Sequence, residues 1–437
     1  MTEIRFVIQF IRFNSSPVLL RLGTGIHLIY GESGVGKSAL CRRLALSKNE
    51  LKPHNFTLSR ISGYSSPMMV FQDPDVQIVA PTVGRELAFN LENLGWNFTK
   101  IQRRISKLES TFSLSFSKDR NPATLSGGER ELLNIVTAIS TSPDLLLIDD
   151  GMSFLSGKTK SRCIDLLRKW TKEKHSVVLW FTSDPDDLGK SESRWQLSLD
   201  SLTRIEEPFE KKYNTVQKNT GEMLMRLKGL SFSYPESEPL FDELSLEVGP
   251  FRSLAVLGEN GSGKSTFGAL VSGVEQPLSG SIELSMGNNQ SMIAALPQSP
   301  ERLFEGFTPS ELAKMMMAEN RASENFLKEV IDAVGYFQIA WERVCDVPVH
   351  ELSLSEARLV LISLLCQANY DLLIFDEPMF SLGIAQRQKL MESLQNVLRH
   401  KYLILITHDE KEADALCDML LRIHEGELSI SSIQSYA

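Results

Sequence analysis

Two short stretches of this chain space glycine, lysine and serine in a way that can hold phosphate groups. Residues 31–38 read GESGVGKS and residues 258–265 read GENGSGKS, and both fit the pattern G-x-x-x-x-G-K-[S/T]. In such a loop backbone N–H groups face the phosphates, the lysine neutralises phosphate charge, and the serine hydroxyl binds Mg²⁺ at a helix N-terminus. The sequence therefore predicts two nucleotide sites. The expected binding residues are Gly31, Gly34, Gly36, Lys37 and Ser38 in the first loop, and Gly258, Gly261, Gly263, Lys264, Ser265 and Thr266 in the second.

The later motifs of the first half recur in the second half at a nearly constant offset. The offset is 227 residues from Lys37 to Lys264, 226 from Gln72 to Gln298, 227 from Ser126 to Ser353 and 227 from Asp149 to Asp376. An internal repeat of this length indicates two whole domains and not a solenoid of small units.

Short apolar runs alternate with helical patterns in both halves, as at 176–181 and 402–406. This alternation predicts a largely parallel sheet flanked by helices, with ligands bound beyond the carboxyl ends of the strands. A polar stretch without an apolar period, residues 203–222, is expected to be a linker. It separates a first domain, 1–202, from a second domain, 223–437.

The composition is that of an ordinary globular chain, with 42% hydrophobic and 23% charged residues. No apolar run approaches the roughly 18 to 20 residues of a membrane span, and the five cysteines form no C-x-x-C pair. A net charge of −9 argues against broad binding to nucleic acid. We expect a cytoplasmic protein with reduced thiols and no zinc site.

The chain resembles, over nearly its whole length, a fused pair of ABC ATPase subunits. The resemblance rests on the two phosphate loops together with LSGGE at 125–129, LLLIDD at 145–150, LLIFDE at 372–377 and THD at 407–409. It implies an α/β fold with two tandem P-loop domains. Each would have a mainly parallel sheet core, an antiparallel portion and a helical subdomain that carries the signature loop.

In this family two domains pair head to tail, and each ATP lies between the phosphate loop of one domain and the signature loop of the other. The resemblance implies that Asp376 holds magnesium, Glu377 polarises the attacking water and His408 contacts the terminal phosphate. Gln298 would sense magnesium and water, and Tyr234 is placed to stack on adenine. The signature residues that would close this second site are Ser126, Gly127 and Gly128.

The first site, with Ser38, Gln72 and Asp149 as its expected metal-binding residues, departs from the family pattern. Asp150 replaces the catalytic glutamate, Ser183 replaces the histidine, and the facing loop 352–356 reads LSLSE. A shorter general base and side chains in place of phosphate-contacting glycines both weaken catalysis. These departures predict ATP binding without useful turnover. The alternative is that Asp150 still works and the loop has merely drifted.

Residues 70–83 and 86–95 narrow the resemblance to the ATPases of energy-coupling factor (ECF) importers of vitamins and metal ions, and residues 296–304 carry a looser version. This implies an integral membrane coupling subunit and a small substrate-capture membrane protein as partners, with the chain peripheral on the inner face of the cell membrane. A segment after each glutamine would receive a partner helix. For most of residues 87–94 and 315–317 we expect packing within the domain, and docking of part of them is the alternative. Phe13 is a candidate adenine stacker or a core aromatic.

Three other classes share ABC domains. A sugar-type tandem importer is the nearest alternative, and the QDPDVQ run at 72–77 favours the ECF type. A translation-associated tandem ATPase has a long charged linker and two intact signatures. A chromosome or DNA-repair ATPase needs coiled-coil or zinc insertions, for which the chain has neither room nor cysteines. The transported substrate is not encoded here.

Overall fold

The computed structural model describes residues 3–11, 16–46, 55–114, 116–155, 157–209, 221–235, 239–259, 261–285, 292–424 and 426–432. The chain forms two compact units, Met1–Lys211 and Lys212–Ala437. The division falls within the stretch expected to be a linker, of which 210–220 lies outside the described residues, as does Phe13. Thr203 and Arg204 pair with the preceding strand, so the first sheet extends two residues into that stretch.

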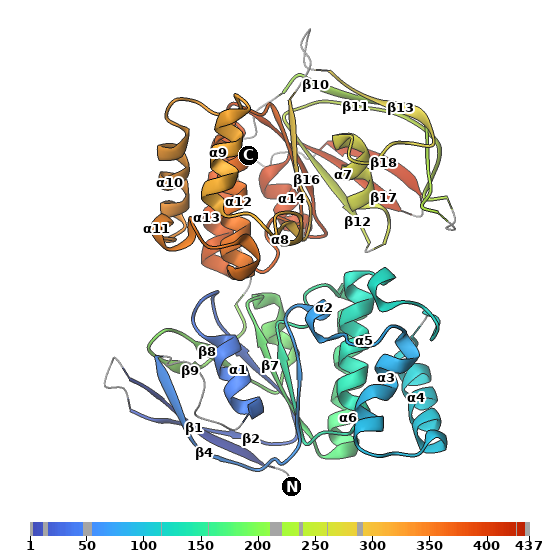
Figure 1. Cartoon of the computed structure of the whole chain (residues 1–437), viewed down its shortest axis with the longest axis vertical. Helices are drawn as coiled ribbons and strands as arrows, with labels where there is room; N and C mark the ends of the chain where they lie inside the picture. The colour runs from blue at the N-terminus through green and yellow to red at the C-terminus, as the bar shows by residue number, and fades with distance from the viewer. Residues whose placement is uncertain are drawn as a thin grey trace. The chain divides into compact units, whose positions relative to one another are not determined.

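The first unit combines two sheets with helices (Figure 1). Its strands are β1 Ile4–Phe10, β2 Val18–Leu22, β3 Gly25–Tyr30, β4 Phe56–Ser62, β5 Pro67–Val70, β6 Leu145–Asp149, β7 Val177–Thr182, β8 Ser193–Leu197 and β9 Leu202–Arg204. Its helices are α1 Lys37–Leu46, α2 Pro74–Gln77, α3 Val83–Asn93, α4 Phe98–Phe112, α5 Gly127–Ser140 and α6 Gly157–Lys174, with 3₁₀ turns at Pro122–Thr124 and Pro185–Lys190.

A six-stranded sheet with the order β5-β6-β7-β3-β8-β9 forms the centre of the first unit. All its pairings are parallel except β8 with β9. Every residue of β3, β6 and β7 is buried, as expected for parallel strands covered on both faces. Because parallel strands end at one edge, β3, β6 and β7 deliver Tyr30, Asp149 and Thr182 to the same side of the sheet.

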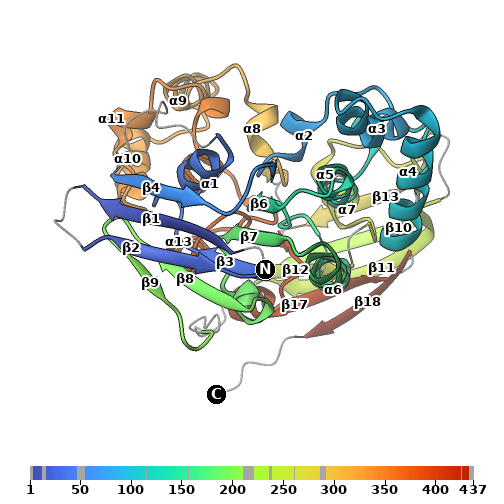
Figure 2. The ribbon, with the colours of Figure 1, turned by 90° about the horizontal axis from the view of Figure 1, so that it is seen from below.

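A second, antiparallel sheet, β2-β1-β4, packs over α1. Apolar side chains of β1 and β4, of α1 and of the central strands join in one buried cluster, so α1 lies between the two sheets. Figure 2 shows α1 and α6 on opposite sides of the central strands. Helices α3 and α4 stand beside α5, the helix that follows the signature loop (Figure 1).

The second unit repeats this architecture. Its strands are β10 Met223–Phe232, β11 Phe241–Phe251, β12 Ser253–Gly258, β13 Ser279–Ser285, β14 Ile293–Leu296, β15 Leu372–Asp376, β16 Tyr402–Ile406, β17 Met419–His424 and β18 Glu427–Ser432. Its helices are α7 Lys264–Ser272, α8 Pro300–Leu303, α9 Pro309–Ala318, α10 Phe326–Tyr336, α11 Trp341–Val344, α12 Leu354–Gln367, α13 Ile384–Val397 and α14 Glu410–Leu416, with a 3₁₀ turn at Val349–Glu351.

The strand order β14-β15-β16-β12-β17-β18 matches that of the first unit strand for strand, and β11-β10-β13 is the antiparallel sheet. Helix α7 lies between the two sheets, as α1 does. The predicted fold class is thereby confirmed, including its parallel core and antiparallel portion. Among the described residues, no helix has the length and apolar character needed to cross a membrane.

Candidate functional site

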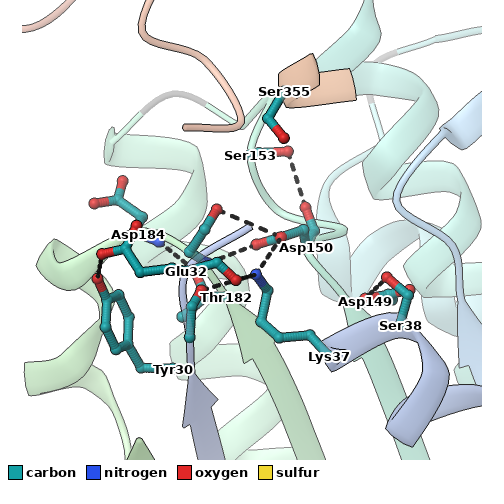
Figure 3. Close-up of polar contacts among 12 residues, drawn as sticks. Tyr30, Glu32, Lys37, Ser38, Asp149, Asp150, Ser153, Thr182, Asp184 and Ser355 are labelled. Atoms are coloured by element: carbon teal, nitrogen blue, oxygen red, sulfur yellow. Dashed lines mark hydrogen bonds and ion pairs between the residues drawn. The ribbon is translucent and has the colours of Figure 1, made fainter. Parts of the chain in front are cut away.

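The first phosphate loop connects the buried strand β3 to α1 and has the backbone conformation that its glycines allow. Gly34 and Gly36 have φ of 84° and 103°, in the region that side chains disfavour. A Cβ on Gly31 would lie 2.8 Å from Val35, so the turn also needs that glycine. The Lys37 ammonium donates to the carbonyls of Gly31 at 2.8 Å and Glu32 at 3.2 Å (Figure 3). The lysine therefore lies inside the curve of its own loop.

The second phosphate loop, between β12 and α7, has the same geometry. Gly261 and Gly263 have φ of 83° and 97°. Lys264 donates to the carbonyls of Gly258 at 2.8 Å and Glu259 at 2.9 Å. Burial lowers the pKa of Lys264, against the attraction of Glu377 and Asp376. Both loops thus present a lysine and a helix N-terminus, the arrangement that binds phosphate.

An aspartate ends the buried strand next to each loop. Asp149 accepts a hydrogen bond of 3.0 Å from the Ser38 hydroxyl (Figure 3), and Asp376 is hydrogen-bonded to Ser265. Burial is the main cause that raises the pKa of each aspartate to about 6. A paired hydroxyl and carboxylate in each unit offer the oxygen ligands that Mg²⁺ prefers.

The glutamines lie at the same sheet edge as these pairs. Gln72 follows β5 by two residues and Gln298 follows β14 by two, and each of these strands pairs with the strand that ends in the aspartate. Within the described residues no group of three His, Cys, Asp or Glu could hold a metal alone. This donor set suits Mg²⁺, which usually takes its other ligands from water and nucleotide phosphate.

The carboxylate after each aspartate distinguishes the two units. Glu377 and Asp150 share a left-handed backbone, with φ of 50° and 49°. The Glu377 carboxylate lies 2.8 Å from Nδ1 of His408, and this hydrogen bond raises the pKa of His408. The second unit therefore brings the predicted glutamate and histidine into direct contact beside Lys264 and Asp376.

Asp150 has different partners. Its carboxylate accepts from the backbone N–H of Ser183 at 2.9 Å and lies 3.5 Å from the Ser183 hydroxyl. Lys37 is 3.9 Å away (Figure 3), and burial raises the pKa of Asp150. The shorter side chain is thus held against the backbone, at the position where the second unit has a histidine.

Both signature loops begin a helix in the same way. Ser126 and Glu129 form a capping box at α5, and Ser353 and Glu356 form one at α12. Leu354 and Ser355 therefore replace the two glycines without changing how the helix starts.

The signature glycines also have a packing role. A Cβ on Gly127 would lie 2.9 Å from the ring of Phe154, and one on Gly128 would lie 2.9 Å from the Phe154 carbonyl oxygen. In the second unit Ser381 stands at the position of Phe154, 227 residues later.

Tyr234 follows β10 and contacts the start of α7. Its hydroxyl lies 3.1 Å from that of Thr266, its ring stacks edge-on against Phe232, and 44% of its surface is exposed. Adenine stacking by Tyr234 stays a prediction.

Buried charges behind each site were missed by the motif analysis. Asp187 joins the Thr182 hydroxyl at 2.9 Å to the Lys160 ammonium at 2.7 Å. The second unit has the same network with longer side chains. There Glu412 accepts from the Thr407 hydroxyl at 2.8 Å and lies 3.4 Å from Arg387. The repeat offset, applied to charged residues as well as motifs, would have paired Lys160 with Arg387.

Two curated relatives align with most of the chain. A putative ABC transporter ATP-binding protein of Methanosarcina mazei is 23% identical over 85% of this chain and 78% of the relative. A putative HMP/thiamine import ATP-binding protein, YkoD of Bacillus subtilis, is 22% identical over 92% of this chain and 85% of the relative.

Solved structures agree on the fold. A chain of ribosome-bound archaeal Pelota and ABCE1 matches with a TM-score of 0.66 and 19% identity, over 92% of this chain and 72% of that chain. RNase-L inhibitor matches with a TM-score of 0.60 and 19% identity, over 93% of this chain and 85% of that chain. At this identity the likeness shows the fold alone.

The sequence pattern of the ABC transporter family matches residues 21–153 and 241–380, which together are more than half of the chain. Each match contains a phosphate loop, a signature loop and an acidic strand. The chain is therefore a member of the ABC transporter family of ATPases and carries the family's ATP-binding domain twice.

Proposed function

We propose that this ABC ATPase energises an importer of the ECF type and hydrolyses ATP mainly at the phosphate loop of the second unit. The observation that carries the site assignment is the contact of Glu377 with His408, 2.8 Å, next to Lys264 and Asp376. A carboxylate held by a histidine beside a phosphate loop can polarise a water toward the terminal phosphate.

The chain's own residues divide the work at this site. The N–H groups of the loop and Lys264 bind the phosphates, while Ser265, Asp376 and Gln298 hold Mg²⁺. Bound Mg²⁺ neutralises charge on the phosphates during transfer. Glu377 orients and polarises water, and His408 keeps the Glu377 side chain in place and contacts the terminal phosphate. Closure is completed by Ser126, Gly127 and Gly128 of the first unit's signature loop, in a head-to-tail pairing of the two units.

The first site binds ATP and Mg²⁺ with little turnover in this proposal. Its loop and its Ser38–Asp149 pair are complete, which supports binding. Its carboxylate, Asp150, is one methylene shorter and is held by Ser183. Misplacing a general base forfeits much of its contribution, which is about 10²- to 10⁴-fold.

Substitution of the two carboxylates in the full chain tests this asymmetry. We expect Glu377→Gln to lower kcat for Mg-ATP about 100-fold or more, and Asp150→Asn to retain at least about half of it. Lys37→Ala should reduce nucleotide binding without abolishing turnover. Equal loss in Glu377→Gln and Asp150→Asn would show that both sites hydrolyse, which is the alternative interpretation. Chelation of Mg²⁺ should stop hydrolysis in every variant.

Exposed apolar side chains support a docking role near each glutamine. In the first unit Val76 is 68% exposed, and Val79 and Phe89 are also exposed. In the second unit Leu303 is 61% exposed. The second group also includes Phe307, Met315 and Met317. We propose that these segments receive helices of a membrane coupling subunit and place the chain on the inner face of the cell membrane.

The importer assignment is supported by the relative named for HMP/thiamine import, which aligns with 92% of this chain. The test is purification of the full chain with Glu377→Gln under Mg-ATP from native membranes in mild detergent. Recovery of one polytopic protein with a small hydrophobic capture protein would support the ECF type and identify the substrate class. Recovery of a sugar-type permease would support an importer but contradict the assignment to the ECF type. Recovery of ribosomes, as the name of one structural neighbour would suggest, would overturn the importer proposal.

A further inference from the structure

One position on the signature helix holds an acidic side chain in the first unit and a basic one in the second. Glu131 on α5 and Arg358 on α12 are 227 residues apart, the offset of the repeat. Both side chains are buried, with exposed fractions of 0% and 2%. A buried polar group costs free energy unless hydrogen bonds compensate it, so both side chains are expected to be hydrogen-bonded.

Glu131 holds the loop that follows β6. Its carboxylate accepts from the backbone N–H of Ser153 at 3.0 Å and of Phe154 at 2.8 Å. The Ser153 hydroxyl in turn donates to the Asp150 carbonyl at 2.8 Å (Figure 3). In the first unit, therefore, the backbone next to the catalytic position is held by one acid and one serine.

Other side chains of α5 hold the segment after Gln72. Asn134 donates to the carbonyl of Pro74 at 2.8 Å, and Arg130 forms an ion pair of 3.1 Å with Asp75. In the first unit the glutamine segment and the loop after β6 thus have separate anchors.

Arg358 takes both tasks in the second unit. Its guanidinium donates to the carbonyl of Glu377 at 2.8 Å, to that of Phe380 at 3.0 Å and to that of Gln298. The residues at the positions of Arg130 and Asn134 are Ala357 and Leu361, which have no polar side-chain group. A single rigid cation therefore joins the glutamine segment to the residue that carries the catalytic carboxylate.

We propose that Arg358 is a positioning residue that makes the Gln298 segment and the Glu377 backbone move as one body. A partner that displaces the Gln298 segment would then change the position of the Glu377 carboxylate directly. In the first unit the contacts described above divide these two tasks among Glu131, Asn134 and Arg130. This inference rests on the proposed function, in which Glu377 polarises the attacking water.

The geometry of the donor group explains why arginine is required. A guanidinium has five N–H donors in a planar fork and can reach several carbonyls at once. A lysine ammonium is a compact point donor and cannot span the same set without losing contacts. A glutamine side chain at this position would be shorter than arginine and uncharged.

The test compares Arg358→Gln and Arg358→Lys in the full chain, with kcat and KM for Mg-ATP, nucleotide affinity and Tm measured for each. Because the carbonyls that Arg358 binds belong to Gln298, Glu377 and Phe380, we expect kcat to fall about 10- to 100-fold in Arg358→Gln while KM changes about threefold or less. Arg358→Lys should lie between this variant and the wild type. The matched control is Arg43→Gln, which removes another buried arginine, on α1, whose guanidinium donates to the Phe56 carbonyl. It should lower Tm and keep kcat within about twofold.

A second substitution separates positioning from general loss of structure. Phe380 stands where the first unit has Ser153. Adding Phe380→Ser to Arg358→Gln supplies a hydroxyl for the Glu377 carbonyl and should recover part of kcat. If neither Arg358 variant changes kcat while Glu377→Gln abolishes hydrolysis, the positioning role is overturned and the proposed function stands. If Glu377→Gln itself keeps its activity, the proposed function fails. If Arg358→Gln does not fold, wild-type kcat in Arg358→Lys would overturn the positioning role.

Discussion

At the scale of single residues, the buried ion pair behind each site keeps its charges and differs in side-chain length. Lys160 with Asp187 and Arg387 with Glu412 build the same buried contact from side chains of different length. Glu131 departs from this pattern, because its counterpart Arg358 is basic and not acidic. Glu131 is also a buried acid whose pKa is raised by burial to about 8.

Glu131 should therefore make the first unit less stable as the pH rises. A carboxyl whose pKa is higher in the folded than in the unfolded chain stabilises the fold below its unfolded pKa, and this contribution is lost as pH rises through about 8. We expect Glu131→Gln to gain about 2 kcal/mol in free energy of unfolding, relative to wild type, between pH 6 and pH 8. Urea unfolding followed by tryptophan fluorescence measures this, since four of the five tryptophans lie in the first unit. The exposed Glu92→Gln is the control, and an equal gain there would contradict the prediction.

Sequence motifs could predict which residues meet at the site, because spacing fixes their order and parallel strands bring their ends together. Asp376, Gln298, Glu377 and His408 do lie at the carboxyl ends of neighbouring strands or shortly after them, and Lys264 starts the helix that follows β12. Sequence could not predict Arg358 or Glu131, because their partners are backbone groups of loops, which leave no side-chain signal. Domain pairing and the role of each residue remain proposals.

At the scale of elements, the start of α5 shows a constraint that the motif alone conceals. Gly127 and Gly128 are explained by phosphate binding in the family pattern, yet both also lie against Phe154. In the second unit the corresponding positions hold Leu354 and Ser355 in place of the glycines and Ser381 in place of Phe154. The two units thus differ both at the helix start and in the following loop.

Gly127→Ala tests this packing constraint. Alanine ordinarily favours a helix over glycine, but here its Cβ would lie 2.9 Å from the Phe154 ring. We expect a loss of about 1 to 3 kcal/mol in the stability of the first unit, as for other overpacked sites. Adding Phe154→Ser, which copies the second unit, should recover part of that loss. A higher Tm for Gly127→Ala alone would show that the ring moves aside freely.

At the scale of the whole molecule, the two units differ sharply in charge. The first has 28 basic and 24 acidic residues and the second has 18 and 31, so their net charges are +4 and −13. Opposite net charges favour the pairing of one unit with the other, and two second units from different chains would repel. Net charge therefore favours the pairing of unlike units, which the proposed function requires.

Salt should weaken that pairing. The screening length falls from about 10 Å at 0.1 M salt to about 3 Å at 1 M, which removes long-range attraction. We expect kcat at saturating Mg-ATP to fall about two- to fivefold between roughly 0.05 and 0.5 M NaCl. Nucleotide affinity, measured in parallel, separates this effect from weaker phosphate binding. A kcat that stays constant or rises with salt would count against electrostatic pairing.

Asp150 and Glu377 share a left-handed backbone conformation. At this position the residue that suits catalysis and the residue that suits the fold are different. Aspartate enters this conformation more readily than glutamate, whose longer side chain gains no local hydrogen bond there. In the proposed function, Glu377 therefore trades stability for activity, whereas Asp150 in the first unit fits the turn better. A unit that binds ATP without hydrolysing it would then be the more stable of the two. Glu377→Asp should accordingly raise Tm even as hydrolysis falls.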